Sequence, residues 1–466
     1  MLFVQFDSAE TSVCATIQNS RGRQSQTLRI IYTRQRQRLF VVPTLFSHDG
    51  QKVGAQEAKP LMRISQLAQQ IKESPTLKLN EEAMLMKERG APVINMSAGQ
   101  PANKAPITAI LGSAAKLKTG EMKYTPVDGL KSLKQAIIRY TEENYGRQPA
   151  PENVIISTGA KQSIFNVLFS ILNPQDEVII LAPYWVSYPE MVKMCYGVPV
   201  IVTPEDGSFY PRFEEIEQAL SSYTRAIIVN SPNNPSGVMY SEELIASLVD
   251  LCERRGIYLI MDDIYHKLVF DGRQHTPAYR YTTRDIDDSH IVVINGVSKL
   301  YGMTGTRIGW AIANRQLVEV MTNVQGQITS SPPVISQAAA EGALTGMQSI
   351  VENLRLTIQN NRDVILAELR SFTDVRVTKP DGTFYCLADF RAYSNDSVEL
   401  AHFLLHKALV VTVPGKEFGA EGHLRLTYSG SVKEIIEAID RMKWALDPNA
   451  PNEIYIGDRK MIRDWL

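Results

Sequence analysis

The sequence predicts an α/β protein with a large, mostly parallel sheet covered by helices on both faces, beside a smaller α+β domain. Apolar strand-like runs alternate with helical stretches from about residue 100 to residue 345, which is typical of a parallel sheet with both faces buried. Residues 346–447 instead begin with a long helical run and continue with strand-like pieces. The 466 residues exceed the size at which one hydrophobic core keeps growing, so two domains are expected.

Five apolar runs are expected to form strands of the large sheet. They are Asn153–Ser157, Glu177–Leu181, Ala226–Val229, Tyr258–Met261 and Ile291–Ile294. Between the third and the fourth, Ser241–Gly256 predicts a crossover helix, with serine before it, glutamates in its first turn, arginines in its last turn and glycine behind it. A further helix is expected over Ser431–Leu446 in the smaller domain.

The composition excludes several classes of protein. The 49 basic and 50 acidic residues give a net charge of -1, so no nucleic acid is expected as a partner. No run reaches the ~18 apolar residues of a membrane-spanning helix, so no membrane is expected either. Four widely spaced cysteines form no CxxC pair, which argues against a zinc site or a disulfide framework and favours a reducing, cytoplasmic location. These cysteines are Cys14, Cys195, Cys252 and Cys386.

Residues 1–61 form an N-terminal extension of different composition. Positions 11–48 contain six arginines and no acidic residue. Three interpretations stay open: a disordered or untranslated extension, a transit peptide that would direct the protein to an organelle, and a true start at Met62.

The loops that follow the predicted strands carry the candidate site, because ligands of α/β sheets bind beyond the carboxyl ends of the strands. Gly159-Ala160-Lys161 opens a helix after the first strand, where backbone N–H groups and the helix dipole can hold a phosphate. Trp185 follows the second strand and could stack on a flat ring. Asn234, in the NSPNNPSG turn after the third strand, could reach a ligand oxygen.

The fourth and fifth strands supply the reactive groups. In MDDIYHKL, Asp262 and Tyr265 could serve a protonated ring nitrogen and a ring oxygen. The tandem aspartates lack further ligands nearby, so no metal is expected. Lys299 has basic and aromatic neighbours that can lower its pKa and favour imine formation with an aldehyde, and Arg307 suits a phosphate ester. Together these loops suggest a flat, phosphorylated heteroaromatic aldehyde, and pyridoxal phosphate fits that description.

Eight segments in order carry a specific resemblance to a known family. They are YTPVDG, STGAKQ, PYWVSYPE, NSPNNPSG, DDIY, SKLYGMTGTRIGW, PDGTFY and HLRLTYSG. This set resembles the class I aminotransferases of the aspartate aminotransferase-like family, which are fold-type I pyridoxal-phosphate enzymes. The resemblance runs from about Met62 to Leu446 and implies a large sheet of the seven-stranded type.

The resemblance also implies a domain plan for the chain. Residues 62–104 would be the N-terminal segment of the small domain, residues 105–345 the large cofactor-binding domain and residues 346–447 the small C-terminal domain. A tail of residues 448–466, interrupted by proline and asparagine, would follow.

The resemblance assigns roles around the cofactor. Lys299 would bond to the aldehyde and then move the proton between the substrate α-carbon and cofactor C4′. Asp262 would pair with the ring nitrogen, Tyr265 and Asn234 would hold the 3-oxygen, and Trp185 would stack on the ring. The phosphate contacts would come from Gly159, Ala160, Lys161, Ser298, Arg307 and the partner subunit's Tyr124, so a homodimer is expected. The chain has Gly296 three residues before the lysine, where family members often place a phosphate-binding hydroxyl.

The implied reaction is a ping-pong transfer between an amino acid and a 2-oxo acid. Arg425 would bind the α-carboxylate as a fork, with Gly99, Trp185 and Asn234 beside it. Lys161 occupies the position of a lysine that meets the distal carboxylate in the bacterial and archaeal aspartate aminotransferases, so aspartate with 2-oxoglutarate is the expected pair.

Several other functions remain open from the sequence. Lys161 could merely flank the phosphate loop, and the substrate could be aromatic or alanine-like. A carbon–sulfur lyase or a cyclopropane-forming synthase would use the same lysine and aspartate. A transcription regulator would need a DNA-binding domain before residue 62, and that stretch has no helix-turn-helix pattern.

Overall fold

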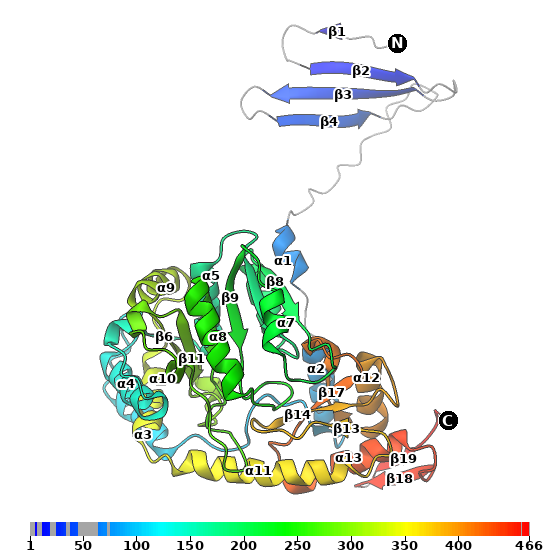
Figure 1. Cartoon of the computed structure of the whole chain (residues 1–466). Coiled ribbons are helices and arrows are strands. Elements are labelled where there is room, and N and C mark those ends of the chain that lie inside the picture. Colours follow the sequence, from blue (N-terminus) through cyan, green and yellow to red (C-terminus); the bar gives the residue numbers. More distant parts are fainter. Residues whose placement is uncertain are drawn as a thin grey trace. The chain divides into compact units, whose positions relative to one another are not determined.

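The computed structural model describes residues 64–71, 75–457 and 459–465, together with the backbone of four strands within residues 5–44. The chain divides into two compact units, Met1–Ser65 and Gln66–Leu466. In the first unit, the strands form an antiparallel sheet in the order β1-β2-β3-β4 (Figure 1). They are β1 (Gln5–Phe6), β2 (Ser12–Gln18), β3 (Ser25–Thr33) and β4 (Arg38–Thr44). The interpretations of residues 1–61 stay predictions.

A seven-stranded sheet forms the centre of the second unit, in the order β6-β12-β11-β10-β9-β7-β8. Its strands are β6 (Val154–Ser157), β7 (Glu177–Leu181), β8 (Val198–Val202), β9 (Thr224–Val229), β10 (Tyr258–Asp262), β11 (Ile291–Gly296) and β12 (Gly309–Ile312). Only β12 runs antiparallel to its neighbours within this sheet. The predicted α/β class and all five predicted strands are confirmed.

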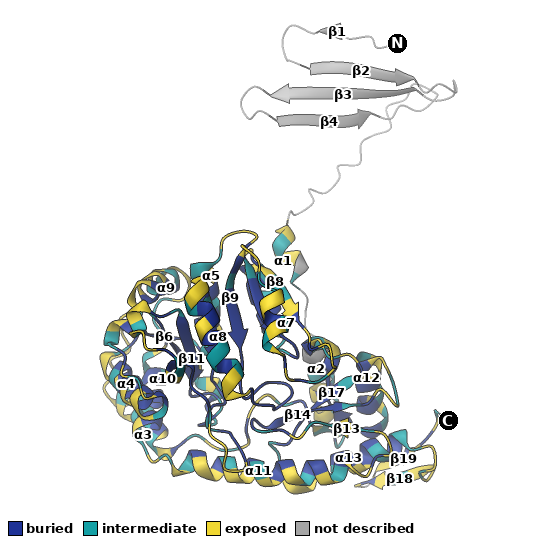
Figure 2. Ribbon diagram, in the orientation of Figure 1, coloured by how far each residue is buried: buried dark blue, intermediate teal, exposed yellow. Residues whose placement is uncertain are grey.

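Helices cover both faces of this sheet, whose strands are largely buried (Figure 2). Alternate strand residues belong to two separate cores. Ile179 of β7 packs with one core and Ile180 with the other, as the two-residue period of a strand requires. One core includes residues of α4 (Lys131–Tyr145), α8 (Glu242–Arg255) and α10 (Val334–Thr345). The other includes residues of α5 (Ala160–Ile171), α6 (Ser187–Met194) and α9 (Arg315–Ile328).

The crossover helix forms where the sequence predicted it. The Ser241 side chain accepts a hydrogen bond from the backbone N–H of Leu244 at 3.2 Å, which satisfies one free donor of α8. Gly256 ends the helix with a left-handed φ of 67°, which glycine adopts without steric strain. The predicted C-terminal helix also forms, as α13 (Val432–Leu446), with Ser431 as its cap.

The part of the chain that follows the large sheet contains an antiparallel sheet in the order β13-β14-β17-β16, which we call the smaller layer together with its helices. The strands of this sheet are β13 (Arg376–Val377), β14 (Tyr385–Asp389), β16 (Val413–Pro414) and β17 (His423–Thr427). A separate two-stranded sheet brings in a segment from before the large sheet, because β5 (Ile94–Asn95) pairs in parallel with β15 (Val410–Val411). The helices not yet named are α1 (Gln66–Gln70), α2 (Pro75–Glu88), α3 (Ile107–Lys118), α7 (Phe213–Gln218), α11 (Ser349–Leu369) and α12 (Ser397–Ala408). The predicted domain boundaries stay predictions.

The C-terminal tail contains a hairpin that the sequence did not predict, β18 (Glu453–Ile456) with β19 (Arg459–Ile462). Beyond it, Trp465 lies edge-on to Trp444 at 5.4 Å between ring centroids. Within the described ranges, none of the helices has the length and apolar content needed to cross a bilayer.

The antiparallel strand β12 explains why the chain has Gly296. Gly296 lies opposite Gly309 in the β11–β12 pair. A Cβ on Gly296 would lie 2.9 Å from the Ile308 carbonyl oxygen and 3.1 Å from the Gly309 Cα. Both neighbours are backbone atoms, so a hydroxyl-bearing side chain here would push the strands apart.

We therefore expect Gly296→Ser to destabilise the protein by about 1–3 kcal/mol, as overpacking does in tight cores. The thermal unfolding midpoint measures the effect. Gly305→Ala is the matched control, because a Cβ at Gly305 would have no atom within 4 Å. Equal midpoints for the two variants would contradict this explanation.

Candidate active site

A cavity of about 650 Å³ opens at the carboxyl ends of the large sheet's parallel strands. This volume is within the usual range for small-molecule sites. Its walls come from the segment around Gly99, from the large sheet and from the smaller layer that carries Arg425. Eleven of the thirteen predicted site residues line it: Gly99, Ala160, Lys161, Trp185, Asn234, Asp262, Tyr265, Ser298, Lys299, Arg307 and Arg425.

The two remaining predicted residues lie elsewhere. Gly159 directly precedes α5 and packs under the Arg307 guanidinium. Tyr124 is 92% exposed and lines a separate hollow with Met122 and Pro332. A single chain therefore does not bring Tyr124 to the cavity, and the expected contact from the partner subunit stays a prediction.

Asp262 is a buried carboxylate at the end of β10. The Tyr188 hydroxyl donates to its Oδ2 at 2.5 Å, and the Asn230 amide donates to its backbone carbonyl at 2.7 Å. Burial raises the pKa of Asp262 to about 6, and the hydrogen bond from Tyr188 opposes that rise. The carboxyl group is held in one orientation and is suited to face a cation.

Lys299 follows β11, and its Nζ donates a hydrogen bond to the Gly99 carbonyl. Its pKa is lowered to about 8, first by burial and next by the Arg425 guanidinium, while Asp262 acts in the opposite direction. An appreciable fraction of the amine is therefore neutral near physiological pH, and a neutral amine is the form that attacks a carbonyl.

Arg425 of β17 is buried between two aromatic rings. Its guanidinium carbon lies 4.3 Å from the Tyr385 ring centroid and 5.1 Å from that of Phe418. Nη1 donates to Asn234 Oδ1 at 3.0 Å, and Nη2 donates to the Ser97 carbonyl at 2.9 Å. Nε has no acceptor among the described residues, and burial lowers the pKa of the guanidinium. This buried cation lacks a counter-anion in the part of the chain described.

A second anion-binding corner forms where α5 begins. Gly159 has a left-handed φ of 85°, and a Cβ there would clash with the Arg307 guanidinium. A Cβ on Gly309 would likewise clash with the backbone nitrogen of Ala160. Glycines thus let arginine and β12 approach the helix N-terminus, where amides and the helix dipole favour a phosphate. Arg307 Nη1 donates to the Thr304 carbonyl at 3.0 Å, which orients the guanidinium.

Lys161 and Trp185 lie together on the cavity wall. The Lys161 Nζ lies 4.8 Å from the centre of the Trp185 ring. Burial, and then the Arg307 charge, lower the pKa of Lys161. Trp185 in turn packs edge-on against Tyr188, at 5.3 Å between ring centroids. Tyr188 therefore holds the Trp185 ring in place, while the Lys161 ammonium lies over that ring.

Sequence reasoning missed several residues that shape the site. Tyr188, Tyr385 and Asn230 lay inside quoted segments, PYWVSYPE, PDGTFY and NSPNNPSG, without being assigned a role. Asn230 Oδ1 accepts from the Asn234 backbone N–H at 2.8 Å, so it positions that side chain. Ser97, in the segment SAGQP around Gly99, and Phe418 were also assigned no role, because only the folded chain brings them to Arg425.

The fold and this site define a transaminase. The chain belongs to the family of class I and II aminotransferases, whose model matches residues 91–442. The resemblance read from the sequence is thereby confirmed, as are the fold type and the enzyme class.

Individual relatives have the same activity in their names. The chain is 36% identical to a probable aspartate/prephenate aminotransferase of Thermus aquaticus, over 82% of this chain and 99% of that protein. It is 34% identical to the aspartate aminotransferase of Bacillus subtilis, over 82% and 98%.

Solved structures of aspartate aminotransferases have the same fold as this chain. The Thermus thermophilus aspartate aminotransferase with maleate superposes at a TM-score of 0.78 with 34% identity, covering 82% of this chain and all of that one. The aspartate aminotransferase of Rhizobium meliloti gives 0.78 with 33% identity, covering 82% and 98%.

The lowered pKa of Lys299 predicts how fast the apoenzyme captures an aldehyde at different pH. Only the neutral amine attacks, so the rate should rise roughly tenfold per pH unit and level off near the pKa of about 8. Stopped-flow absorbance with pyridoxal phosphate measures this rate. Nα-acetyl-lysine is the reference, since its amine has an ordinary pKa. It reacts with the same aldehyde, so changes in the protonation of pyridoxal phosphate affect both rates equally. A rate that tracks the reference up to pH 10 would contradict the shift.

Proposed function

We propose that the protein is a pyridoxal-phosphate-dependent aminotransferase that exchanges the amino group between aspartate and 2-oxoglutarate. The observation that carries this proposal is that one cavity holds the Lys299 amine, the Arg425 fork and Lys161 beside Trp185, in addition to Arg307 at the phosphate corner. The Lys299 amine would do the chemistry, and Arg425 and Lys161 suit the two carboxylates of a dicarboxylic substrate.

The residues present fit pyridoxal phosphate. The corner formed by Gly159, Ala160 and Arg307 suits the phosphate, with Lys161 and Ser298 beside it. Asp262 suits a cationic ring nitrogen, because that cation would offset the unfavourable burial of its charge. Bound there, the cofactor would supply an aldehyde for the amine and a ring that accepts electron density from the substrate.

The aromatic and amide side chains would position the ring. Trp185 would stack on one face. Asn234 accepts from Arg425 through Oδ1, so its amide nitrogen is left to donate to the ring's 3-oxygen, together with the Tyr265 hydroxyl. Burial holds the pKa of Tyr265 well above its usual value, so the phenol keeps its proton and stays a donor.

Lys299 would carry the proton during transfer. Its pKa of about 8 lies near the working pH, which is where a general acid–base is most effective. Its amine would take the proton from the substrate α-carbon and return it at the cofactor's C4′. The Gly99 carbonyl, in the segment before the large sheet, accepts a hydrogen bond from the amine and so orients it.

The choice of a dicarboxylic substrate rests on Arg425 and Lys161. The Arg425 fork would bind the α-carboxylate, with Gly99 near it. Lys161 would meet the distal carboxylate. The relatives named aspartate aminotransferases support this choice, and maleate, present with the Thermus thermophilus protein, is itself a dicarboxylate.

We also propose that the protein is a homodimer. The molecular mass of the protein in solution tests this. Tyr124 and Met122 line one hollow and are exposed, as are Ile107 and Leu111 on α3, and exposed apolar patches commonly mark interfaces. The partner subunit's Tyr124 would then reach the phosphate corner.

We expect a cytoplasmic location, or an organellar one if residues 1–61 are a transit peptide.

Arg425→Lys should lower kcat/KM for aspartate by roughly 100-fold, about 3 kcal/mol. An ammonium cannot make the bidentate contact and would leave Asn234 and the Ser97 carbonyl without their donors. Steady-state kinetics measures the loss. Arg391→Lys is the control, because that arginine is exposed and pairs only with Asp389 among the described residues. Similar kinetics in both variants would argue against the carboxylate role.

A half-reaction screen tests the substrate. The holoenzyme is mixed with single amino acids, and absorbance follows conversion of the cofactor to its amine form. Aspartate and glutamate should react fastest, and Lys161→Ala should reduce their rates at least about tenfold while sparing alanine. Lys193→Ala is the control, because that lysine pairs with Glu190 on α6. Faster reaction with aromatic amino acids or alanine would refute the dicarboxylate assignment, and pyruvate with ammonia would indicate a lyase.

A further inference from the structure

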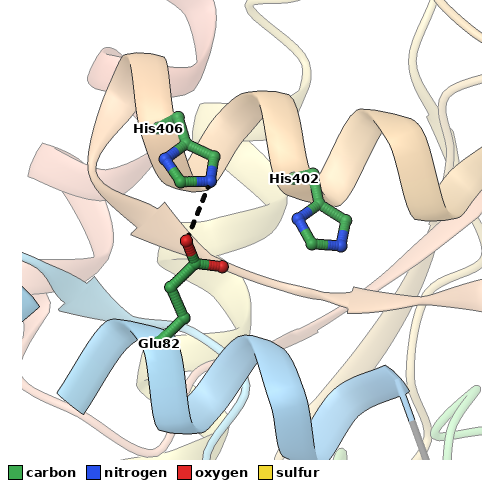
Figure 3. A group of neighbouring side chains, drawn as sticks. All are labelled: Glu82, His402 and His406. Carbon is green, nitrogen blue, oxygen red and sulfur yellow. Dashed lines mark ion pairs between the residues drawn. The ribbon is translucent and has the colours of Figure 1, made fainter. Parts of the chain in front are cut away.

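Three metal-binding side chains gather away from the active-site cavity, on two packed helices. Figure 3 shows Glu82 on α2 facing His402 and His406 on α12. Each residue offers a ligand atom, and all three atoms lie within 4.8 Å of one another. The cluster lies at the junction between the N-terminal segment and the smaller layer.

The helix positions the two imidazoles as a pair. Residues four apart lie on the same face of an α-helix, one turn above each other. The rings of His402 and His406 are nearly parallel, with 9° between their planes and 6.4 Å between centroids. Both rings therefore face the same space, and Glu82 reaches that space from α2.

A simple ion pair explains only part of the cluster. His406 Nε2 lies 3.2 Å from Glu82 Oε1, which a protonated imidazole and a carboxylate would favour. His402 takes part in no hydrogen bond or ion pair with any described residue, although it shares the face. Two neighbouring imidazolium ions would repel each other, whereas two neutral imidazoles can both donate an electron pair to one cation.

The ligand set matches a borderline-soft divalent metal. Two histidines and one glutamate are a known set for Zn²⁺, with a fourth position left for water. Tetrahedral ligands at about 2.05 Å lie about 3.3 Å apart. The observed 4.8 Å limit therefore has to shrink by about 1.5 Å. Both imidazoles are exposed and Glu82 is half-buried, so side-chain rotation can close that gap without moving the helices.

We propose that Glu82, His402 and His406 bind one divalent transition-metal ion of the Zn²⁺ type and thereby fasten α2 to α12. The ion would cross-link two helices that lie far apart in the sequence.

This cross-link lies on the helix that reaches the active site. Asn80, two residues before Glu82 on α2, lines the cavity and accepts a hydrogen bond from Ser97 Oγ at 2.6 Å. The Ser97 carbonyl in turn accepts from Arg425. Fixing α2 would therefore fix one support of the buried guanidinium.

Calorimetric titration of the tag-free holoenzyme with ZnCl₂, in buffer without free cofactor or amino acid, tests the site. We expect saturable binding of one ion per chain. His402→Gln, His406→Gln and Glu82→Gln should each weaken it at least about tenfold, and Mg²⁺ should not compete because it prefers oxygen ligands. His423→Gln is the control, since it removes one partly exposed imidazole outside the cluster. Absence of saturable binding, or undiminished binding in the His402→Gln/His406→Gln double variant, would overturn the site.

Hydrogen exchange tests the fastening. With bound Zn²⁺, amide exchange across Pro75–Glu88 should slow in the wild-type protein and stay unchanged in the double variant. Unchanged exchange in the wild-type protein at saturating Zn²⁺ would overturn the cross-link. Both readouts are independent of transaminase activity, so they succeed or fail separately from the proposed substrate.

Discussion

The burial of Asp262 is the constraint on which the rest of the site depends. A carboxyl group at the end of a central strand has its pKa raised to about 6 by burial, against an ordinary value of 3.8. The folded protein therefore binds this proton more tightly than the unfolded chain does. Raising the pH from about 4 to above 6 weakens the folded state, because the buried group ionises. A cation placed beside it removes that penalty, so stability and ligand binding are coupled here.

The same burial sets the chemistry of the basic groups. Lys299 and Arg425 lose hydration in the cavity and repel each other, so the pKa of the lysine falls toward neutrality. Arginine keeps its charge under such burial far better than lysine does. One cation thus becomes a reactive amine and the other remains a binding group. The stacking of Arg425 on Tyr385 and Phe418 favours the charged guanidinium and holds it in position as the binding group.

Much of the site could be predicted from the sequence because its residues directly follow apolar strands. Asp262 ends β10 and Lys299 lies three residues after the end of β11, and both strands are mostly apolar. Strand β12 was missed because its four residues, GWAI, include glycine and alanine, which are depleted in strands. Strand β8 was missed because it contains a proline and is partly exposed at the sheet edge.

Contacts between distant segments could not be predicted. No local pattern indicates that Tyr188 would donate to Asp262, or that Ser97 would accept from Arg425. The approach of Arg307 to Gly159 likewise depends on how β12 packs beside β6. The pairing of Glu82 with the histidines of α12 arises in the same way, from the docking of the N-terminal segment onto the smaller layer.

The most direct test of the account is to find which lysine bonds to the cofactor. The holoenzyme would be reduced with borohydride, which makes the link between lysine and pyridoxal phosphate permanent, and then digested for mass spectrometry. We predict the phosphopyridoxyl group on Lys299 alone. Lys161 is the informative rival, because it lies in the same cavity and its pKa is also lowered. Modification of Lys161, or of no lysine, would contradict the assignment of Lys299 as the reactive amine.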